Sequence, residues 1–239
     1  MTEHVRLTAA AVDTLPLVLA DRHRALPVGA ELEVDPGDLA PELVDDLLMG
    51  AGFTVARTAA DRVAGAPPVR AVRAWSLPDT VGPGMGLLVC GLNPSPGAAD
   101  SGVGFFRAGN RFWPAAIAAG IVRADRAPRA ALVDDGVGMT DLVKRTTARA
   151  ADLRPDEYRD GMARVERLVR RWPPGAVVFV GLAGWRIAVD RHARPGVAER
   201  RIGEVPVYVM PSTSGLNAGT TLDELVGHLR AAAALAAPR

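Results

Sequence analysis

Three continuous apolar runs define the C-terminal two thirds of the chain. They cover residues 87–92, 176–182 and 205–210, and such runs are typical of strands covered on both faces of a parallel sheet. Helical patterns follow them, most clearly at residues 162–172 and 222–235, where apolar residues recur every three to four positions. This alternation predicts a three-layer α/β/α domain with a short, mainly parallel central sheet.

The N-terminal third predicts a separate, small α/β domain. Helix-compatible patterns at residues 9–26 and 39–49 alternate with strand-compatible runs at residues 30–34, 53–58 and 69–75. The runs are shorter and less apolar than those of the C-terminal part, so we expect a smaller sheet.

The charge changes sign near a stretch rich in glycine and proline, residues 78–86, which we interpret as a linker. The whole chain has a formal net charge of only +1. Residues 1–80 contain 7 basic and 12 acidic residues, whereas residues 81–239 contain 21 basic and 15 acidic residues. We therefore predict an acidic domain at residues 1–80 and a basic domain at residues 81–239, and a basic domain suits a polyanionic partner.

Composition excludes several classes of protein. A lone cysteine, Cys90, excludes a disulfide framework and a cysteine-built metal site. The four histidines are far apart, without ligand spacing, and no apolar run approaches the ~18–20 residues of a membrane span. The N-terminus lacks the apolar segment of a signal peptide. We expect a cytoplasmic protein that has no contact with a membrane.

Two predicted strands end in loops that could carry chemistry, because sites in open α/β sheets lie at the carboxyl ends of strands. The first strand leads into Asn93, which Pro94 restricts to an extended backbone; an ordinary Asn-Pro turn would contain the same residues. The third leads into residues 210–217, MPSTSGLN, whose hydroxyl groups suit phosphate binding or a capped, solvated loop. Within this loop Leu216 is either a core residue or an exposed wedge.

A segment between these loops interleaves aromatic residues with arginines. Residues 105–113 read FFRAGNRFW, a composition that suits stacking on a nucleic-acid base, although such aromatic residues are also common in cores. Phe112 and Trp113 begin an apolar helical pattern and are expected in the core. Phe105 and Phe106 are the better candidates for contact with a ligand.

The chain from residue 86 onward resembles the mismatch-specific branch of the uracil-DNA glycosylase superfamily, which contains bacterial mismatch uracil glycosylase and thymine-DNA glycosylase. Four motifs occur in the order and approximate spacing of that branch, and the resemblance covers about two thirds of the chain. The motifs are GLNPS at residues 91–95, GNRFW at residues 109–113, GVGMTDLVKRTT at residues 136–147 and MPSTSGLN at residues 210–217. The resemblance implies the fold of these glycosylases and a role in base excision repair.

The resemblance assigns catalytic and stacking roles to four residues. Asn93 matches the catalytic asparagine that positions the hydrolytic water, and Thr140 matches a residue whose backbone carbonyl helps to hold that water. Phe105 matches the aromatic residue that stacks on the flipped base, with Phe106 as the alternative.

Further roles concern the base and the duplex. The backbone around Gly91 and Leu92 would read the pyrimidine edge, and Ala98 would leave room for the 5-methyl group of thymine. The remaining matches lie in the last motif. Ser212 and Ser214 would contact phosphates, while Gly215, Leu216 and Asn217 would enter the duplex and contact the guanine left unpaired.

These residues predict a monofunctional DNA glycosylase. Asn93 can orient a water molecule but cannot deprotonate it efficiently, so we expect a mostly dissociative cleavage of the glycosidic bond. Lys144 is the only lysine of the chain, and a Schiff-base lyase step therefore has no obvious nucleophile. The expected substrate is double-stranded DNA with uracil, thymine or a damaged pyrimidine opposite guanine, without a metal or other cofactor. Such an enzyme would be associated with the nucleoid and could hand its abasic product to downstream repair enzymes.

The alternative function is a module of the same fold that binds mismatches or single-stranded DNA without cleavage. The first eighty residues lie outside the resemblance. Their element order is faintly similar to the C-terminal half of a class I methyltransferase or to a small sulfur carrier, but the motifs of both are missing. We expect an accessory or interaction module whose negative charge disfavours strong DNA contact.

Overall fold

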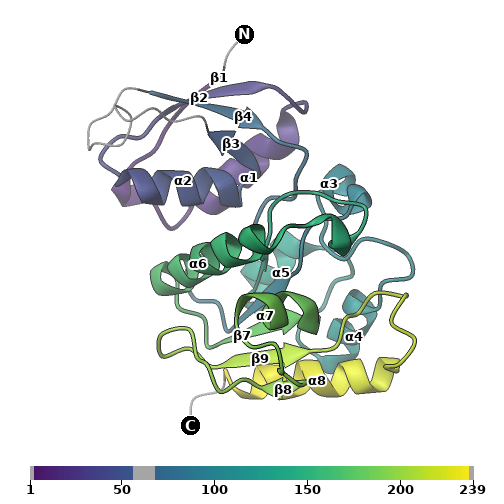
Figure 1. Cartoon of the computed structure of the whole chain (residues 1–239). Helices are drawn as coiled ribbons and strands as arrows, with labels where there is room; N and C mark the ends of the chain where they lie inside the picture. Colours follow the sequence, from purple (N-terminus) through teal and green to yellow (C-terminus); the bar gives the residue numbers. More distant parts are fainter. Residues whose placement is uncertain (1–2, 56–67, 237–239) are drawn as a thin grey trace.

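The computed structural model describes residues 3–55 and 68–236. A small α/β unit, residues 3–73 and called here the N-terminal unit, lies against a larger α/β domain that includes the C-terminus (Figure 1). We call residues 81–236 the C-terminal domain. Within the described residues, no helix is long and apolar enough to cross a membrane.

The N-terminal unit is a four-stranded mixed sheet with two helices. The sheet order is β1-β2-β4-β3, with β1 parallel to β2 and the other pairs antiparallel. Its helices lie between this sheet and the C-terminal domain (Figure 1). The elements are β1 (Glu3–Arg6), α1 (Leu15–Ala25), β2 (Glu31–Asp35), α2 (Pro41–Gly50), β3 (Phe53–Val55) and β4 (Val69–Arg73).

The sequence pattern predicts most of these elements. The expected helix at residues 9–26 divides into a short 3-10 turn at Ala9–Ala11 and α1, which begins next to Pro16. The strand β1 was not predicted, because it has only four residues and its outward positions are polar. The end of the strand expected at residues 53–58 lies outside the described residues.

The C-terminal domain contains a five-stranded sheet of order β6-β5-β7-β9-β8, in which only β8 is antiparallel. Its strands are β5 (Leu87–Gly91), β6 (Val137–Asp141), β7 (Ala176–Val180), β8 (Gly196–Val197) and β9 (Val207–Met210). Its helices are α3 (Pro96–Ser101), α4 (Phe112–Ala119), α5 (Pro128–Asp135), α6 (Pro155–Arg171), α7 (Leu182–Ala188) and α8 (Leu222–Ala234). The three predicted strands are β5, β7 and β9.

Alternate residues of the sheet face two different cores, which confirms the three-layer prediction. Leu88 and Cys90 of β5 belong to the core that includes α6 and the N-terminal unit. Leu87 and Val89 belong to the core formed with α4, α5 and α8. Helices therefore cover both faces of the mainly parallel sheet, as the continuous apolar runs require.

The connection between the two units is buried. Residues 74–86, called here the connecting strap, form no helix or named strand, as its glycine and proline content predicts. Yet Ser76 and Asp79 are each only 3% exposed, and Thr80 pairs with Met139 of β6 through two backbone hydrogen bonds. The stretch interpreted as a linker is thus packed into the junction.

Opposite charges meet at this junction. Helix α2 runs along α6 (Figure 1), and Arg167 of α6 donates to both carboxylate oxygens of Asp46 at 2.6 and 2.8 Å. The indole of Trp172 donates to Asp13 at 2.8 Å, and Arg129 donates to Asp21 at 2.8 and 2.9 Å. The acidic side chains of the N-terminal unit are therefore partly neutralised by the basic domain itself.

Candidate functional site

A cavity of about 180 Å³ opens at the carboxyl ends of β5 and β6, beside the loop that follows β9. Parallel strands bring their carboxyl ends to one edge of a sheet, so segments distant in sequence meet there. Of the residues predicted to form the site, seven line this cavity: Leu92, Asn93, Ala98, Phe105, Phe106, Ser212 and Ser214.

The amide of Asn93 has a defined orientation. Its Nδ2 atom lies 3.0 Å from the carbonyl oxygen of Arg145, 3.2 Å from that of Pro94 and 2.8 Å from Oγ1 of Thr147. The Thr147 hydroxyl donates its own hydrogen to the Arg149 carbonyl at 2.9 Å, so its oxygen accepts from Asn93. All of these partners are acceptors. They fix Nδ2 on their side, and no described protein group donates to Oδ1 of Asn93, which is left for a ligand or water.

Thr140 lies elsewhere. Its side chain is buried, its hydroxyl donates to Asp79 at 2.8 Å, and Arg164 donates to that hydroxyl oxygen at 2.8 Å. Thr140 does not line the cavity that contains Asn93. The threonine in contact with Asn93 is Thr147, seven residues later in the same motif. The Thr140 side chain therefore has no contact with Asn93, and the role predicted for its backbone carbonyl stays a prediction.

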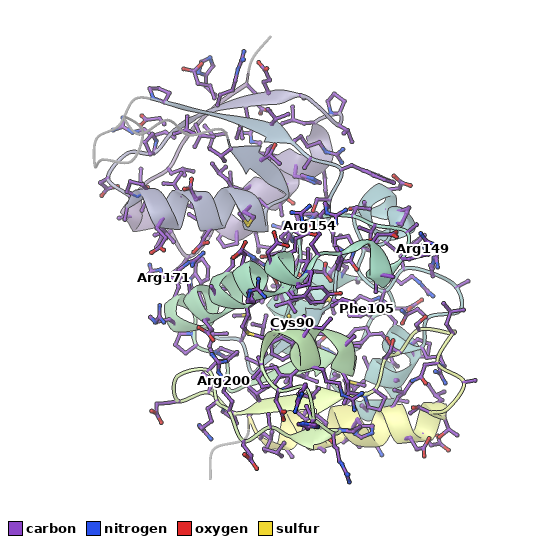
Figure 2. All side chains as sticks on the ribbon, in the orientation of Figure 1. Cys90, Phe105, Arg149, Arg154, Arg171 and Arg200 are labelled. Atoms are coloured by element: carbon purple, nitrogen blue, oxygen red, sulfur yellow. The ribbon has the colours of Figure 1, made fainter. Side chains whose placement is uncertain are left out.

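Phe105 forms one wall of the cavity. Its ring stacks on Phe112 with the centroids 4.2 Å apart and the planes at 22°, which leaves the opposite ring face for a second flat group. Its backbone has φ of +56°, a left-handed conformation that costs a non-glycine residue energy and often occurs at functional sites. Phe106 also lines the cavity and is 41% exposed. Figure 2 shows Phe105 within the C-terminal domain.

Gly91 packs closely against two residues that line the cavity, Asp141 and Phe105. A Cβ atom at Gly91 would lie 2.3 Å from Oδ1 of Asp141 and 3.4 Å from Cζ of Phe105. A side chain at this position would therefore displace both groups. Ala98, at 3% exposure, lines the cavity from the first turn of α3, where Ser95 accepts a hydrogen bond from its backbone nitrogen.

Asp141 is a cavity residue that the sequence analysis missed. It ends β6, lines the cavity and is 8% exposed, and its side-chain carboxylate receives no hydrogen bond from the described residues. Burial raises its pKa to about 6, and the charge of Asp79 acts in the same direction, while Lys144 and Arg164 act to lower it. The signal was present as a charged residue within the motif at residues 136–147. The strand β6 was not recognised, because glycine and polar residues interrupt its apolar pattern.

The loop after β9 is held by an arginine from the FFRAGNRFW segment. Arg111 donates to the backbone carbonyls of Asn217 at 2.7 Å, Ser214 at 3.3 Å and Thr220. A Cβ atom at Gly215 would lie 2.7 Å from the carbonyl oxygen of Gly109, so the two segments approach more closely than a side chain would allow. Arg111 was not among the predicted site residues.

Leu216 stands at the tip of this loop. Its side chain is 91% exposed, the most exposed large apolar residue of the described chain. Asn217 is tied to the loop, since its Nδ2 donates to the Ser212 carbonyl at 2.8 Å and to Thr220 at 3.2 Å. The predicted alternative of a core position for Leu216 is therefore wrong, because a rigid loop presents it to solvent.

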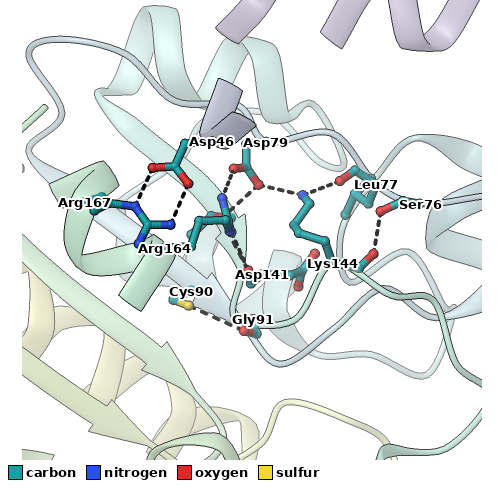
Figure 3. Close-up of polar contacts among 11 residues, drawn as sticks. Asp46, Ser76, Leu77, Asp79, Cys90, Gly91, Asp141, Lys144, Arg164 and Arg167 are labelled. Carbon is teal, nitrogen blue, oxygen red and sulfur yellow. Dashed lines mark hydrogen bonds and ion pairs between the residues drawn. The ribbon is translucent and has the colours of Figure 1, made fainter. Parts of the chain in front are cut away.

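Lys144 belongs to a buried ionic cluster next to the cavity (Figure 3). Its Nζ atom donates to Asp79 at 2.7 Å and to the Leu77 carbonyl, and Arg164 donates to the other oxygen of Asp79 at 2.8 Å. Burial acts to raise the pKa of Asp79, but the two cations outweigh it, and the pKa lies below its ordinary value. Asp79 is therefore ionised at neutral pH, and Lys144 does not line the cavity.

Comparison with known families agrees with the motifs. The family model of the uracil DNA glycosylase superfamily matches residues 78–233, which include the whole five-stranded sheet, the cavity and the loop that presents Leu216.

Proposed function

Because the chain belongs to the uracil DNA glycosylase superfamily, which implies a DNA glycosylase for uracil-type lesions, we propose a finer assignment. The protein is a monofunctional glycosylase that hydrolyses the N-glycosidic bond of uracil or thymine mispaired with guanine and leaves an abasic site. The observation that carries this proposal is the fixed amide of Asn93 at the cavity.

Asn93 orients the attacking water in this proposal. Its Nδ2 atom is committed to Thr147, Arg145 and Pro94, so Oδ1 is available to accept a hydrogen bond from a water molecule. An amide does not take the proton as a carboxylate would. Bond cleavage therefore precedes capture of an oxocarbenium-like sugar by the positioned water. Thr147 holds the Asn93 amide in this geometry.

The base would bind between Phe105 and the strand ends. A pyrimidine stacked on the free face of Phe105 has its edge directed at Asp141, because both groups converge above Gly91. In its protonated form Asp141 can accept from N3–H and donate to a carbonyl oxygen of the base. The small side chain of Ala98 leaves space for a 5-methyl group, which supports thymine beside uracil as a substrate.

The Leu216 loop would open the duplex. Extruding a base costs a few kcal/mol, least for a mispaired base, and an apolar wedge with phosphate contacts offsets that cost. Leu216 has the exposure of a wedge, and Arg111 supplies the rigidity. Ser212 and Ser214 are placed at the cavity, where they would contact the backbone of the extruded nucleotide.

A lyase step has no support in the site. A Schiff base needs an uncharged, accessible amine. Lys144 is instead buried in contact with ionised Asp79 and the Leu77 carbonyl. This arrangement supports a hydrolase that stops at the abasic site.

The test is single-turnover excision from G·U and G·T duplexes, read by alkaline cleavage at abasic sites. We expect cleavage only after alkali, and we expect Asn93→Ala to bind the G·U duplex as the wild type does while its rate falls by at least ~10²-fold. Binding of a mismatch without any abasic product would favour the non-catalytic alternative. Full activity of Asn93→Ala would contradict the mechanism.

A further inference from the structure

We propose that Ser76 and Asp79 of the connecting strap are positioning residues for Asn93 and act through Lys144, so that the strap fixes the geometry of the active site. This inference rests on the proposed function, in which Asn93 orients the water. Ser76 lies two positions before the residues that the family model matches, 78–233, whereas Asp79 lies within them.

The strap holds Lys144 at its backbone and at its side chain. The Ser76 hydroxyl donates to the Lys144 carbonyl at 2.6 Å. The Lys144 ammonium donates to Asp79 at 2.7 Å and to the Leu77 carbonyl. Both ends of the residue are thus fixed by three residues of the strap, Ser76, Leu77 and Asp79 (Figure 3). A buried lysine without such partners would strongly destabilise the folded protein.

Lys144 is directly connected to the acceptors of Asn93. The next residue, Arg145, supplies the carbonyl 3.0 Å from Nδ2 of Asn93, and Thr147 supplies the hydroxyl at 2.8 Å. Arg145 is fixed from the other side, since its guanidinium donates to both oxygens of Glu157 at 2.7 Å. The segment 144–147 is therefore held between the strap and the first turn of α6.

The strap is itself anchored beside the cavity. The indole of Trp75 donates to Asp100 of α3 at 2.7 Å, and Leu77 lines the cavity that contains Asn93. A displacement of Ser76 would thus move the segment that fixes the Asn93 amide. The strap has no direct hydrogen bond to Asn93 among the described residues, so its effect on the Asn93 amide passes through Lys144.

Asp79 also affects the charge balance around Asp141. Three charged groups act on Asp141: Asp79 of the strap, Lys144 of the following loop and Arg164 of α6. The neighbouring thiol of Cys90 on β5 is uncharged at neutral pH. Burial raises the pKa of the Cys90 thiol well above its ordinary value. Loss of the Asp79 charge leaves the two cations unopposed, which lowers the pKa of Asp141. Substitution of Asp79 therefore has a signature in the pH profile that loss of packing alone would not produce.

The experiment uses the full chain and single-turnover excision from a G·U duplex. We expect Ser76→Ala to lower the rate constant about fivefold, the value of one hydrogen bond, with unchanged affinity for the duplex. Thr54→Val is the matched control, because it removes another hydroxyl-to-carbonyl bond, from Thr54 to Val72 at 3.3 Å within the N-terminal unit, and it should retain the wild-type rate.

A double-mutant cycle separates positioning from general destabilisation. In an Asn93→Ala background, Ser76→Ala should have no further effect on the residual rate, because the group that it positions is absent. For Asp79→Asn we expect slower excision, and the midpoint of the dependence of the excision rate on pH should move to lower pH. Ser76→Ala should leave that midpoint unchanged.

The outcomes distinguish the two proposals. Full excision by Asn93→Ala would overturn the proposed function. Loss of excision in Asn93→Ala together with wild-type rates in Ser76→Ala and Lys144→Met would overturn only this inference. An equal loss from Ser76→Ala with and without Asn93 would also overturn it. If Lys144→Met does not fold, the Ser76→Ala cycle decides the question alone.

Discussion

The N-terminal unit and the C-terminal domain each bury a titratable side chain, with different consequences. His23 of α1 is 1% exposed, and burial, with a smaller contribution from Arg73, lowers its pKa to about 4. Its ring packs edge-on against Phe53 and contacts the Ala74 carbonyl at 3.2 Å. Asp141 is also buried with a shifted pKa, but it borders a cavity. Of these two buried groups, Asp141 is the one that a ligand in the cavity could reach.

The two regions also use their charges differently. Acidic residues of the N-terminal unit face arginines of α6 and α5 across the junction. Other arginines of the C-terminal domain, such as Arg149 and Arg200, project from its surface (Figure 2). The opposite net charges found along the sequence therefore belong in part to an internal interface.

The largest expected effect concerns His23. It is neutral in the folded state, while the unfolded chain takes up a proton below pH 6.5, so stability should fall as pH decreases from 6.5 to about 4. The contribution is about 3 kcal/mol. Urea unfolding at pH 7 and pH 4.5 measures it, and His23→Gln should lose less stability on acidification. Asp141 takes up its proton in the folded state, so it stabilises the protein on acidification, in the opposite direction to His23. Asp141 is present in both the wild type and His23→Gln. The difference between their changes in free energy of unfolding therefore gives the contribution of His23. If the stability of the wild type and of His23→Gln depended on pH in the same way, the low pKa assigned to His23 would be contradicted.

The next effect tests the charge complementarity of the junction. Arg167→Glu replaces two hydrogen bonds to Asp46 by repulsion and should lower the free energy of unfolding by about 2 kcal/mol. Reversing the partner as well, in Arg167→Glu with Asp46→Arg, should recover most of that loss. Failure of the double variant to recover would show that packing, not charge, joins the two regions.

A smaller effect concerns the ionisation of Asp141. Uracil leaves as an anion, so an ionised carboxylate beside it opposes cleavage. The excision rate should therefore decrease as pH rises through about 6. Asp141→Asn is neutral at every pH and should excise uracil at pH 8 faster than the wild type, on the order of tenfold.

Two controls sharpen this prediction. Asp141→Ala removes the charge together with the hydrogen-bonding group and should be slower than Asp141→Asn at all pH values. A wild-type rate that increases through pH 6 would instead indicate that the ionised carboxylate is the active form.

The smallest effect is expected at Leu216. Leu216→Ala should reduce excision from a G·U duplex about fivefold through weaker base extrusion, with no change on single-stranded DNA containing uracil. Equal losses on both substrates would exclude a wedge role. Ile117→Ala is a matched control, because this exposed apolar residue lies on α4 rather than on the loop.

The local pattern of the sequence was enough to predict much of the fold. The apolar runs of β5, β7 and β9 are recognisable because strands covered on both faces need apolar residues at every position. The motifs placed Asn93 and the Leu216 loop at strand ends, where parallel sheets bring loops together. The strand β6 was missed because glycine and polar residues interrupt its apolar pattern, and Asp141 was missed with it.

Only the tertiary structure decided which groups touch. Thr140 and Thr147 belong to one motif, and hydrogen-bond geometry alone shows that Thr147 contacts Asn93 while Thr140 joins the buried ion cluster. The strap reads as a linker because glycine and proline break regular structure, yet burial of Asp79 depends on Lys144 and Arg164, which lie 65 and 85 positions away. Sequence fixes local backbone preferences and apolar periodicity, whereas the pairing of distant charges arises only when the chain folds.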